Sequence, residues 1–161
     1  MARENRALNS KGIEKIKIFD YGLSNANRKA KMKYSPDFHS VNSSTGINLD
    51  FFGVNESDLD DVEVEFKNAS DVLKPLLKKH INAFTLLKID IEGDESEVIA
   101  NLNQNNMLNS FNAIVLEWHE KSDAKIIDQL SENGFRIYST RDANEMLGFN
   151  TGMIYAFQTG S

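Results

Sequence analysis

The sequence predicts an α/β domain with a mainly parallel β-sheet and helices on both faces of that sheet. Residues 83–89 form an almost continuous apolar run, which is typical of a strand covered on both faces, and residues 96–102 then show the apolar spacing of a helix. Residues 112–116 form a second apolar run, and a second helical pattern follows it. Strands that alternate with helices favour parallel pairing. With 161 residues, 40% of them hydrophobic, the chain is long enough to bury the core of one domain, residues 1–161.

The amino-terminal part of the chain is expected to contain three strands. Residues 13–19 have the composition of a strand, and residues 20–27 predict a turn after it. Residues 29–34 alternate basic and apolar side chains, and residues 62–66 alternate apolar and acidic ones. These two segments therefore predict an antiparallel pair with its charged side chains on one surface and its apolar side chains toward the core. The facing charges are expected to be Lys29, Lys31 and Lys33 on one strand and Glu63 and Glu65 on the other.

The segment between these two strands, residues 35–61, is rich in Ser, Asn, Asp and Gly. Its length predicts either a functional lid or a mobile insertion. Its aromatic and imidazole side chains would either anchor the segment to the core or contact a substrate; they are Phe38, His39, Phe51 and Phe52.

The ends of the helices are indicated by caps and breakers. Ser70 and Asp71 are expected to cap a helix that begins at Val72, with Pro75 restarting or kinking it. Ser122 or Asp123 would cap the last helix, and Gly134 would end it. Residues 135–139 and 153–157 then predict the last two strands.

Charge and composition narrow the classes of partner. The net charge of −6 argues against nucleic-acid binding, which usually needs a basic surface, and favours a small-molecule partner. The chain has no cysteine, which excludes disulfides, thiolate catalysis and thiolate zinc sites. The first residues are polar, and no apolar run approaches the roughly 18 residues of a membrane helix. We therefore expect a cytoplasmic protein that binds neither membranes nor nucleic acids.

Polar side chains follow both apolar runs of the central region. Asp90 and Glu92 come directly after the first run, and Glu117 and His119 come directly after the second. If the two strands are parallel neighbours, their carboxyl ends bring these groups to one edge of the sheet, where α/β domains bind ligands. The carboxylates could then act as bases, metal ligands or substrate clamps. His119 is either a proton acceptor or a packed histidine, and Trp118 is expected in the core.

The same residues resemble a known family. The stretch Lys88-Ile89-Asp90-Ile91-Glu92-Gly93-Asp94-Glu95 matches the lysine, the Asp-x-Glu-Gly motif and the following glutamate of FkbM-type methyltransferases. Weaker support comes from residues 115–119 and 130–135, from Gly22-Leu23-Ser24 and from residues 69–73. The region from about Ile13 to Phe157 therefore resembles the carboxyl-terminal part of that family's domain.

The resemblance implies a class I methyltransferase fold, which is Rossmann-like, and S-adenosylmethionine as the methyl donor. The acceptor would be a hydroxyl of a sugar or of another small natural product. Lys88 and Asp90 would bind the cofactor, and Asp90, Glu92 and His119 would form the catalytic group. A divalent metal held by Asp90 and Glu117 is compatible with this arrangement.

The resemblance also implies that amino-terminal strands of the fold are missing. The family's glycine-rich turn and its ribose-binding acid should precede Ile13, where this sequence has twelve mostly polar residues. We therefore expect a partial domain with an exposed sheet edge, which a homo-oligomer would cover.

Two other functions compete with methyl transfer. A remnant of the methyltransferase fold could serve as a noncatalytic interaction module, which the missing cofactor half favours. Asp90-x-Glu92 could also be the acid pair of a two-metal exonuclease, although the acidic composition disfavours DNA binding. Cofactor binding would distinguish a methyltransferase from a noncatalytic module. Manganese-dependent nuclease activity would support the exonuclease.

Overall fold

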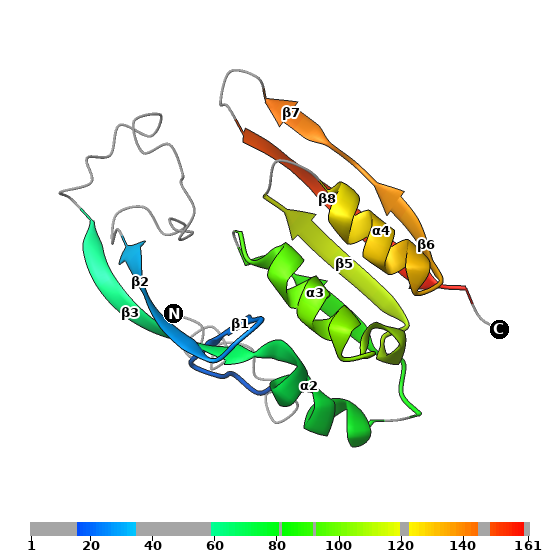
Figure 1. Cartoon of the computed structure of the whole chain (residues 1–161), viewed down its shortest axis with the longest axis horizontal. Coiled ribbons are helices and arrows are strands. Elements are labelled where there is room, and N and C mark those ends of the chain that lie inside the picture. The colour runs from blue at the N-terminus through cyan, green and yellow to red at the C-terminus, as the bar shows by residue number, and fades with distance from the viewer. Residues whose placement is uncertain are drawn as a thin grey trace.

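The computed structural model describes residues 16–34, 59–80, 82–91, 93–119, 123–144 and 149–159. In these ranges the chain forms two β-sheets, three α-helices and one short 3₁₀ helix (Figure 1). A small sheet from the amino-terminal part lies to one side, and the helices lie over or beside a larger sheet built from the carboxyl-terminal half (Figure 1). The α/β class predicted from the sequence is therefore confirmed.

The larger sheet has five strands and mixed strand directions. Its main path runs β4, β5, β8, β6, and β7 pairs with β8. The bounds are β4 Leu86–Ile89, β5 Ala113–Trp118, β6 Phe135–Ser139, β7 Asp142–Asn144 and β8 Phe149–Gln158. The pairing of β4 with β5 is parallel, as predicted, whereas β8 is antiparallel to β5, β6 and β7.

The prediction of a mainly parallel sheet is therefore wrong for this part of the chain. The reason lies in the connection between β6 and β8, which consists of residues 140–148 and includes β7. A parallel crossover needs about a dozen residues or more, whereas an antiparallel return does not. Strand β7 was not expected, because its three residues have no apolar alternation.

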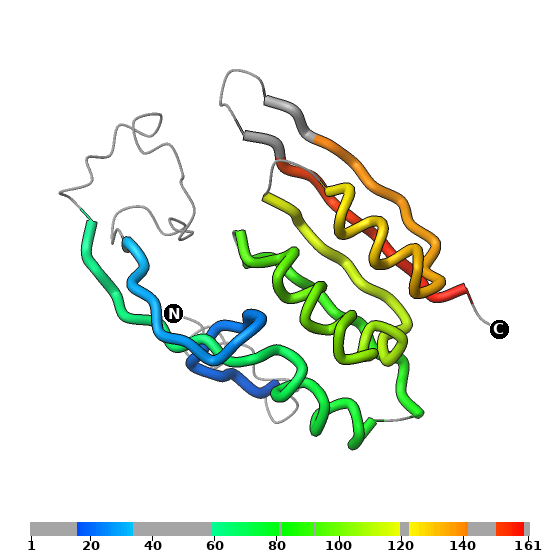
Figure 2. The backbone as a smooth tube through the Cα atoms, viewed as in Figure 1, coloured from blue at the N-terminus to red at the C-terminus, as the bar shows by residue number. Residues whose placement is uncertain are grey.

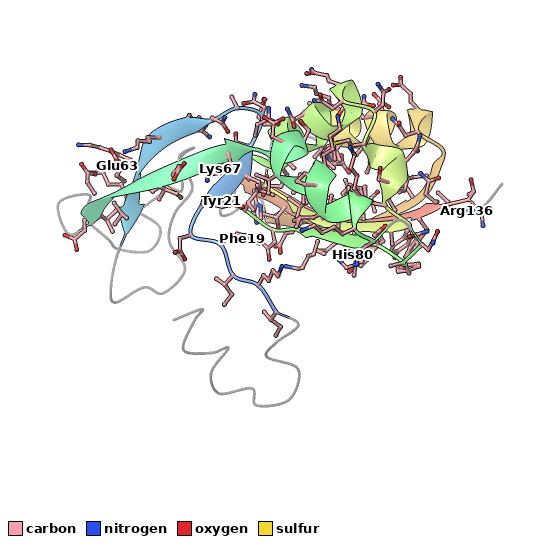
Figure 3. The ribbon with its side chains drawn as sticks, turned by 90° about the horizontal axis from the view of Figure 1, so that it is seen from below. Phe19, Tyr21, Glu63, Lys67, His80 and Arg136 are labelled. Atoms are coloured by element: carbon pink, nitrogen blue, oxygen red, sulfur yellow. The ribbon has the colours of Figure 1, made fainter. Side chains whose placement is uncertain are left out.

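The core lies between this sheet and the helices α2 (Ala69–Lys78), α3 (Glu95–Gln104) and α4 (Ala124–Glu132). Figure 3 shows the described helices on the same side of the five-stranded sheet. Alternate residues of the strands point toward them and are buried; these are Ile89, Ile114, Leu116, Trp118, Ile154 and Ala156. The burial of Trp118 confirms its predicted place in the core.

Large apolar side chains remain exposed elsewhere on the larger sheet. Phe157 in β8 is 51% exposed and Tyr138 in β6 is 66% exposed. The expectation of helices on both faces is thus not met among the described residues. β4 is an edge strand of the described sheet, and the predicted oligomer through such an edge stays a prediction.

The smaller sheet contains β1 (Gly22–Ser24), β2 (Arg28–Tyr34) and β3 (Asp60–Asn68), in the order β1, β3, β2. Its antiparallel β2–β3 pair confirms the pattern predicted from alternating charges. The β2–β3 pair extends away from the helices, as Figure 2 shows. Lys29 lies opposite Glu65 in register, yet its Nζ bonds the diagonal Glu63 Oε1 at 2.8 Å. This contact lowers the pKa of Glu63 and raises the pKa of Lys29.

Two expectations for the amino-terminal region need correction. Residues 16–19 are not in a strand, and residues 13–15 lie outside the described ranges. The strand is instead β1, within the segment predicted as a turn, because Gly22–Ser24 pairs in parallel with Phe66–Asn68. Residues 35–58, with the four aromatic and imidazole side chains noted above, also lie outside the described ranges, and Asp60 and Asp61 belong to β3.

The helix ends follow local hydrogen bonding. Helix α2 begins at Ala69, earlier than expected, because the Asn68 side chain accepts a hydrogen bond from the Asp71 N–H at 3.3 Å. The helix continues through Pro75. Gly134 follows the end of α4 with a φ of 79°, as predicted for a glycine that ends a helix. None of the described helices is long and apolar enough to cross a membrane.

A buried asparagine joins three elements around α3. The Oδ1 atom of Asn101 accepts the Ser70 N–H of α2 at 2.9 Å, and its Nδ2 donates to the carbonyl oxygen of Asn25, after β1, at 3.2 Å. Its two polar ends are therefore both bonded, as a buried amide requires. Through these bonds Asn101 helps to hold α3, whose first turn carries the acids described next.

Candidate functional site

The carboxyl ends of the parallel strands β4 and β5 bring together polar side chains from both. Ile89 lies opposite Leu116 in the register, so the next residues of each strand emerge side by side. One ligand atom from each of Asp90, Glu117 and His119 lies within 4.8 Å of the other two. We call this group the rim. The predicted convergence of the residues after the two strands is thus confirmed for these three side chains.

Glu95, the first residue of α3, lies beneath the rim and is completely buried. Both of its carboxylate oxygens accept the Gly93 N–H at 3.1 Å, and Oε1 also accepts the Ile91 N–H at 3.4 Å. A buried carboxylate needs such donors, because burial removes its hydration. The turn after β4 therefore provides a backbone cradle for one acid.

Gly93 makes this cradle possible. Its φ is 129°, a conformation that residues with a Cβ atom rarely adopt. This conformation aims the Gly93 N–H at Glu95. The glycine of the Asp-x-Glu-Gly motif is thus explained by backbone geometry.

The imidazole of His119 is held by the same buried acid. Its Nδ1 lies 3.0 Å from Oε1 of Glu95, and its Nε2 lies 3.6 Å from Oε1 of Glu117. A carboxylate that already accepts backbone N–H groups favours a further donor, so Nδ1 carries a proton toward Glu95. The ring is therefore oriented with Nε2 toward the rim.

The remaining rim acid, Asp90, has a basic neighbour. Nζ of Lys88, in β4, lies 2.6 Å from Oδ2 of Asp90, which directly follows that strand. The two side chains are partly exposed, at 60% and 35%, so the pair is accessible to a ligand. Lys88 and Asp90 are thus adjacent, as residues of one predicted cofactor site must be.

Asp94 points in another direction from Glu95. Its Oδ2 accepts the Ser24 hydroxyl at 2.9 Å and lies 2.5 Å from Nη2 of Arg28. The guanidinium of Arg28 also lies over the Phe66 ring, 4.3 Å from its centroid. The adjacent acids Asp94 and Glu95 therefore have different roles. Glu95 holds the His119 side chain of the rim, and Asp94 attaches the smaller sheet to α3.

Sequence reasoning identified the rim residues but missed the position of Glu95. Glu95 was noted only as the glutamate that follows the Asp-x-Glu-Gly motif. A usable signal was the placement of Glu95 directly after a strand–Gly turn, in a chain with a histidine after the neighbouring strand. Glu92 lies outside the described residues, so its predicted catalytic role stays a prediction.

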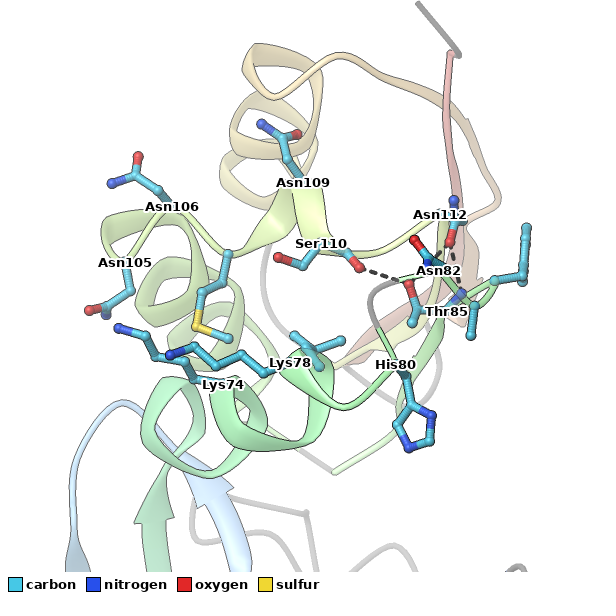
Figure 4. A pocket seen from close by; sticks show the side chains of 14 residues that line it. Lys74, Lys78, His80, Asn82, Thr85, Asn105, Asn106, Asn109, Ser110 and Asn112 are labelled. Carbon is cyan, nitrogen blue, oxygen red and sulfur yellow. Dashed lines mark hydrogen bonds between the residues drawn. The ribbon is translucent and has the colours of Figure 1, made fainter.

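A separate cavity of about 720 Å³ lies near the amino ends of β4 and β5, opposite the rim. Figure 4 shows Lys74 and Lys78 from α2 on one side of it and Thr85, just before β4, on another. Thr85 is fixed there by hydrogen bonds to the Ser110 carbonyl oxygen at 2.7 Å and to Asn112. Because ligands of α/β sheets bind at the carboxyl ends of strands, we assign the candidate site to the rim despite the size of this cavity.

Comparison with known proteins identifies the family. Neither the curated proteins nor the solved structures contain a significant match to the chain. The model of the methyltransferase FkbM domain family matches residues 4–137, which include the strands β4 and β5 and the whole rim. The chain therefore belongs to the FkbM methyltransferase domain family.

Proposed function

We propose that this protein transfers a methyl group from S-adenosylmethionine to a hydroxyl of a small molecule, such as a sugar or another natural product, at the rim. Family membership supports methyl transfer. The observation that supports the rim as the site of the chemistry is the buried Glu95, whose contact with Nδ1 leaves Nε2 of His119 directed toward Glu117.

The chemistry of the rim residues fits the charged end of this cofactor. The carboxylates of Asp90 and Glu117 suit its positively charged sulfonium and amino groups. Nζ of Lys88, 2.6 Å from Asp90, suits its carboxylate. When bound, the cofactor supplies a methyl group on a positively charged sulfur. Lys88 and Asp90 are therefore the residues proposed to hold it.

His119 is the proposed proton acceptor. A hydroxyl oxygen becomes a better nucleophile as its proton is removed, and a positioned imidazole typically contributes about 10²–10⁴-fold to such a step. Glu95 keeps the Nδ1 proton in place, so Nε2 can receive the hydroxyl proton and the imidazolium is stabilised by a buried anion. Glu95 thus acts as a positioning residue.

Cofactor binding tests the first part of this proposal. S-adenosylmethionine and S-adenosylhomocysteine would be titrated into the full chain by calorimetry, with Asp90→Asn as the rim variant. Lys78→Ala, at the separate cavity, is the matched control. We expect binding that Asp90→Asn weakens and Lys78→Ala leaves unchanged. A folded chain that binds neither compound would refute the proposal and favour a noncatalytic interaction module.

The proton-acceptor role is tested with a methyl-labelled cofactor and a panel of hydroxyl compounds. His119→Asn keeps an N–H that can reach Glu95 but lacks Nε2. We expect a loss of about 10²–10⁴-fold in kcat with little change in cofactor affinity. A variant with unchanged kcat would remove His119 from the chemical step.

A further inference from the structure

We propose that Asp90, Glu117 and His119 form a binding site for one divalent transition-metal cation, and that Glu95 positions the imidazole ligand. Each of the three side chains offers one ligand atom, and these atoms lie within 4.8 Å of one another. The sequence predicted only two of these ligands, the carboxylates of Asp90 and Glu117. The structure adds the imidazole and the buried acid behind it.

The donor set selects the class of metal. Two carboxylate oxygens and one imidazole nitrogen suit Zn²⁺ or Mn²⁺, whereas the chain has no thiolates for a structural zinc site. Zinc bonds are about 2.0–2.2 Å long, so two ligand atoms of one tetrahedral ion lie roughly 3.3–3.6 Å apart. Rim atoms as far apart as 4.8 Å would therefore need to close by roughly 1–1.5 Å. The partly exposed side chains of Asp90 and Glu117 have room to do so.

Glu95 distinguishes the rim from an ordinary group of surface acids. Histidines that bind metals almost always donate their other ring N–H to a carboxylate or a carbonyl oxygen, which fixes the tautomer and the direction of the ligand nitrogen. Nδ1 of His119 has this partner in Glu95, at 3.0 Å and fully buried. The imidazole is therefore preorganised as a ligand through Nε2.

Lys88 provides a variant that should bind the metal more tightly than the unchanged protein. Its ammonium group is 2.6 Å from Oδ2 of Asp90 and so occupies one side of a proposed ligand. A bound cation would have to compete with this ammonium for the carboxylate. Removing the positive charge of Lys88 should therefore strengthen metal binding, although Lys88 is not itself a ligand.

This site goes beyond methyl transfer and does not depend on it. With the cation bound, Nε2 of His119 would be a metal ligand and not a proton acceptor. An acceptor hydroxyl bound to the cation would then lose its proton more easily because of coordination. The cation would thus change how the rim activates its acceptor.

The test is calorimetric titration of Zn²⁺ into the chelator-treated full chain, without cofactor or acceptor. We expect one equivalent to bind. His119→Asn should weaken binding at least tenfold through the loss of a ligand, and Glu95→Gln should weaken it about 10–100-fold through the loss of orientation. Lys88→Met should tighten it. Glu63→Gln removes one negative charge from β3 of the smaller sheet, which contributes no ligand to the rim, and should change nothing.

Three results would overturn the proposal: no Zn²⁺ uptake by the folded chain, unchanged affinity in His119→Asn, or weaker binding in Lys88→Met. Circular dichroism would check that each variant is folded. If Glu95→Gln unfolds, the partly exposed Lys88 still provides a decisive variant. Because the titration contains no methyl donor, a failure of methyl transfer would not affect its result, and a failure of Zn²⁺ binding would leave the methyl-transfer proposal standing.

Discussion

Replacing Glu95 by alanine should be the most destabilising change at the start of α3. The carboxylate is completely buried, accepts two backbone N–H groups and contacts Nδ1 of His119 at 3.0 Å. A hydrogen bond to a charged group typically contributes about 1.5–3 kcal/mol, and this carboxylate has three such partners. A buried donor left without an acceptor costs about 1–3 kcal/mol. We therefore expect the free energy of unfolding to fall by about 3–5 kcal/mol.

Glu97→Ala is the matched control for this change. Glu97 lies in the same first turn of α3, is only half-buried and contacts Asn25 of the neighbouring loop. Its loss should cost less than about 1 kcal/mol. Urea unfolding would be followed by the fluorescence of Trp118, the single tryptophan, which is buried next to His119. An unchanged denaturant slope would show that the variants differ in stability and not in the surface they expose.

A double-mutant cycle would assign part of this cost to the contact with His119. Glu95→Ala, His119→Ala and the double variant should show a coupling of about 0.5–3 kcal/mol, as expected for residues in direct contact. The reasoning would be refuted if Glu95→Ala cost no more than Glu97→Ala. Additive effects of the two substitutions would show that Glu95 does not hold the imidazole.

Three other predictions concern the parts that surround the rim. Lys29→Met should raise the pKa of Glu63 toward its ordinary value, because the ammonium now lowers it; an NMR titration would measure this, and an unchanged pKa would exclude the ion pair in solution. Since the folded-state pKa of Glu63 is depressed, its contribution to stability is present above the ordinary pKa and is lost as the pH falls through the lowered one, so the variant should lose less stability in acid. Gly152→Ala should destabilise the protein by about 1–3 kcal/mol, because its Cβ would lie 2.0 Å from the Thr140 carbonyl oxygen and 2.7 Å from Nε1 of Trp118; an unchanged Tm would contradict this packing. Arg28→Met should speed amide hydrogen exchange in β2 while leaving β5 protected, because it removes the 2.5 Å contact with Asp94; equal exchange in both proteins would show that this contact does not hold the smaller sheet.

The elements with strong apolar periodicity were predictable from the sequence. The runs at 83–89 and 112–116 became β4 and β5, and their parallel pairing followed from the helix between them. Alternating charges likewise predicted the β2–β3 pair. In each case local pattern and tertiary pairing agree, so the pattern was sufficient.

The features that depend on distant partners were not predictable in this way. The antiparallel direction of β8 depends on the chain's return from β6, and β1 exists because β3 offers its edge. The buried Glu95 contacts His119, which follows a different strand. Its neighbours Asp94 and Glu97 have the same charge and similar positions in sequence, so periodicity alone could not separate the buried acid from the others.

The position of β8 determines when the larger sheet can form as the chain is synthesised. It is the last strand of the described residues, yet it lies in the interior of its sheet, where Ile154 pairs with Leu116 of β5 and Ser139 of β6. During synthesis β5 and β6 would have no common partner until residues 149–158 had emerged, so this sheet must close late and through non-local contacts. A chain cut at residue 137, where the family match ends, would leave β5 with an unpaired edge. The unit that folds is therefore longer than the segment by which the family is recognised.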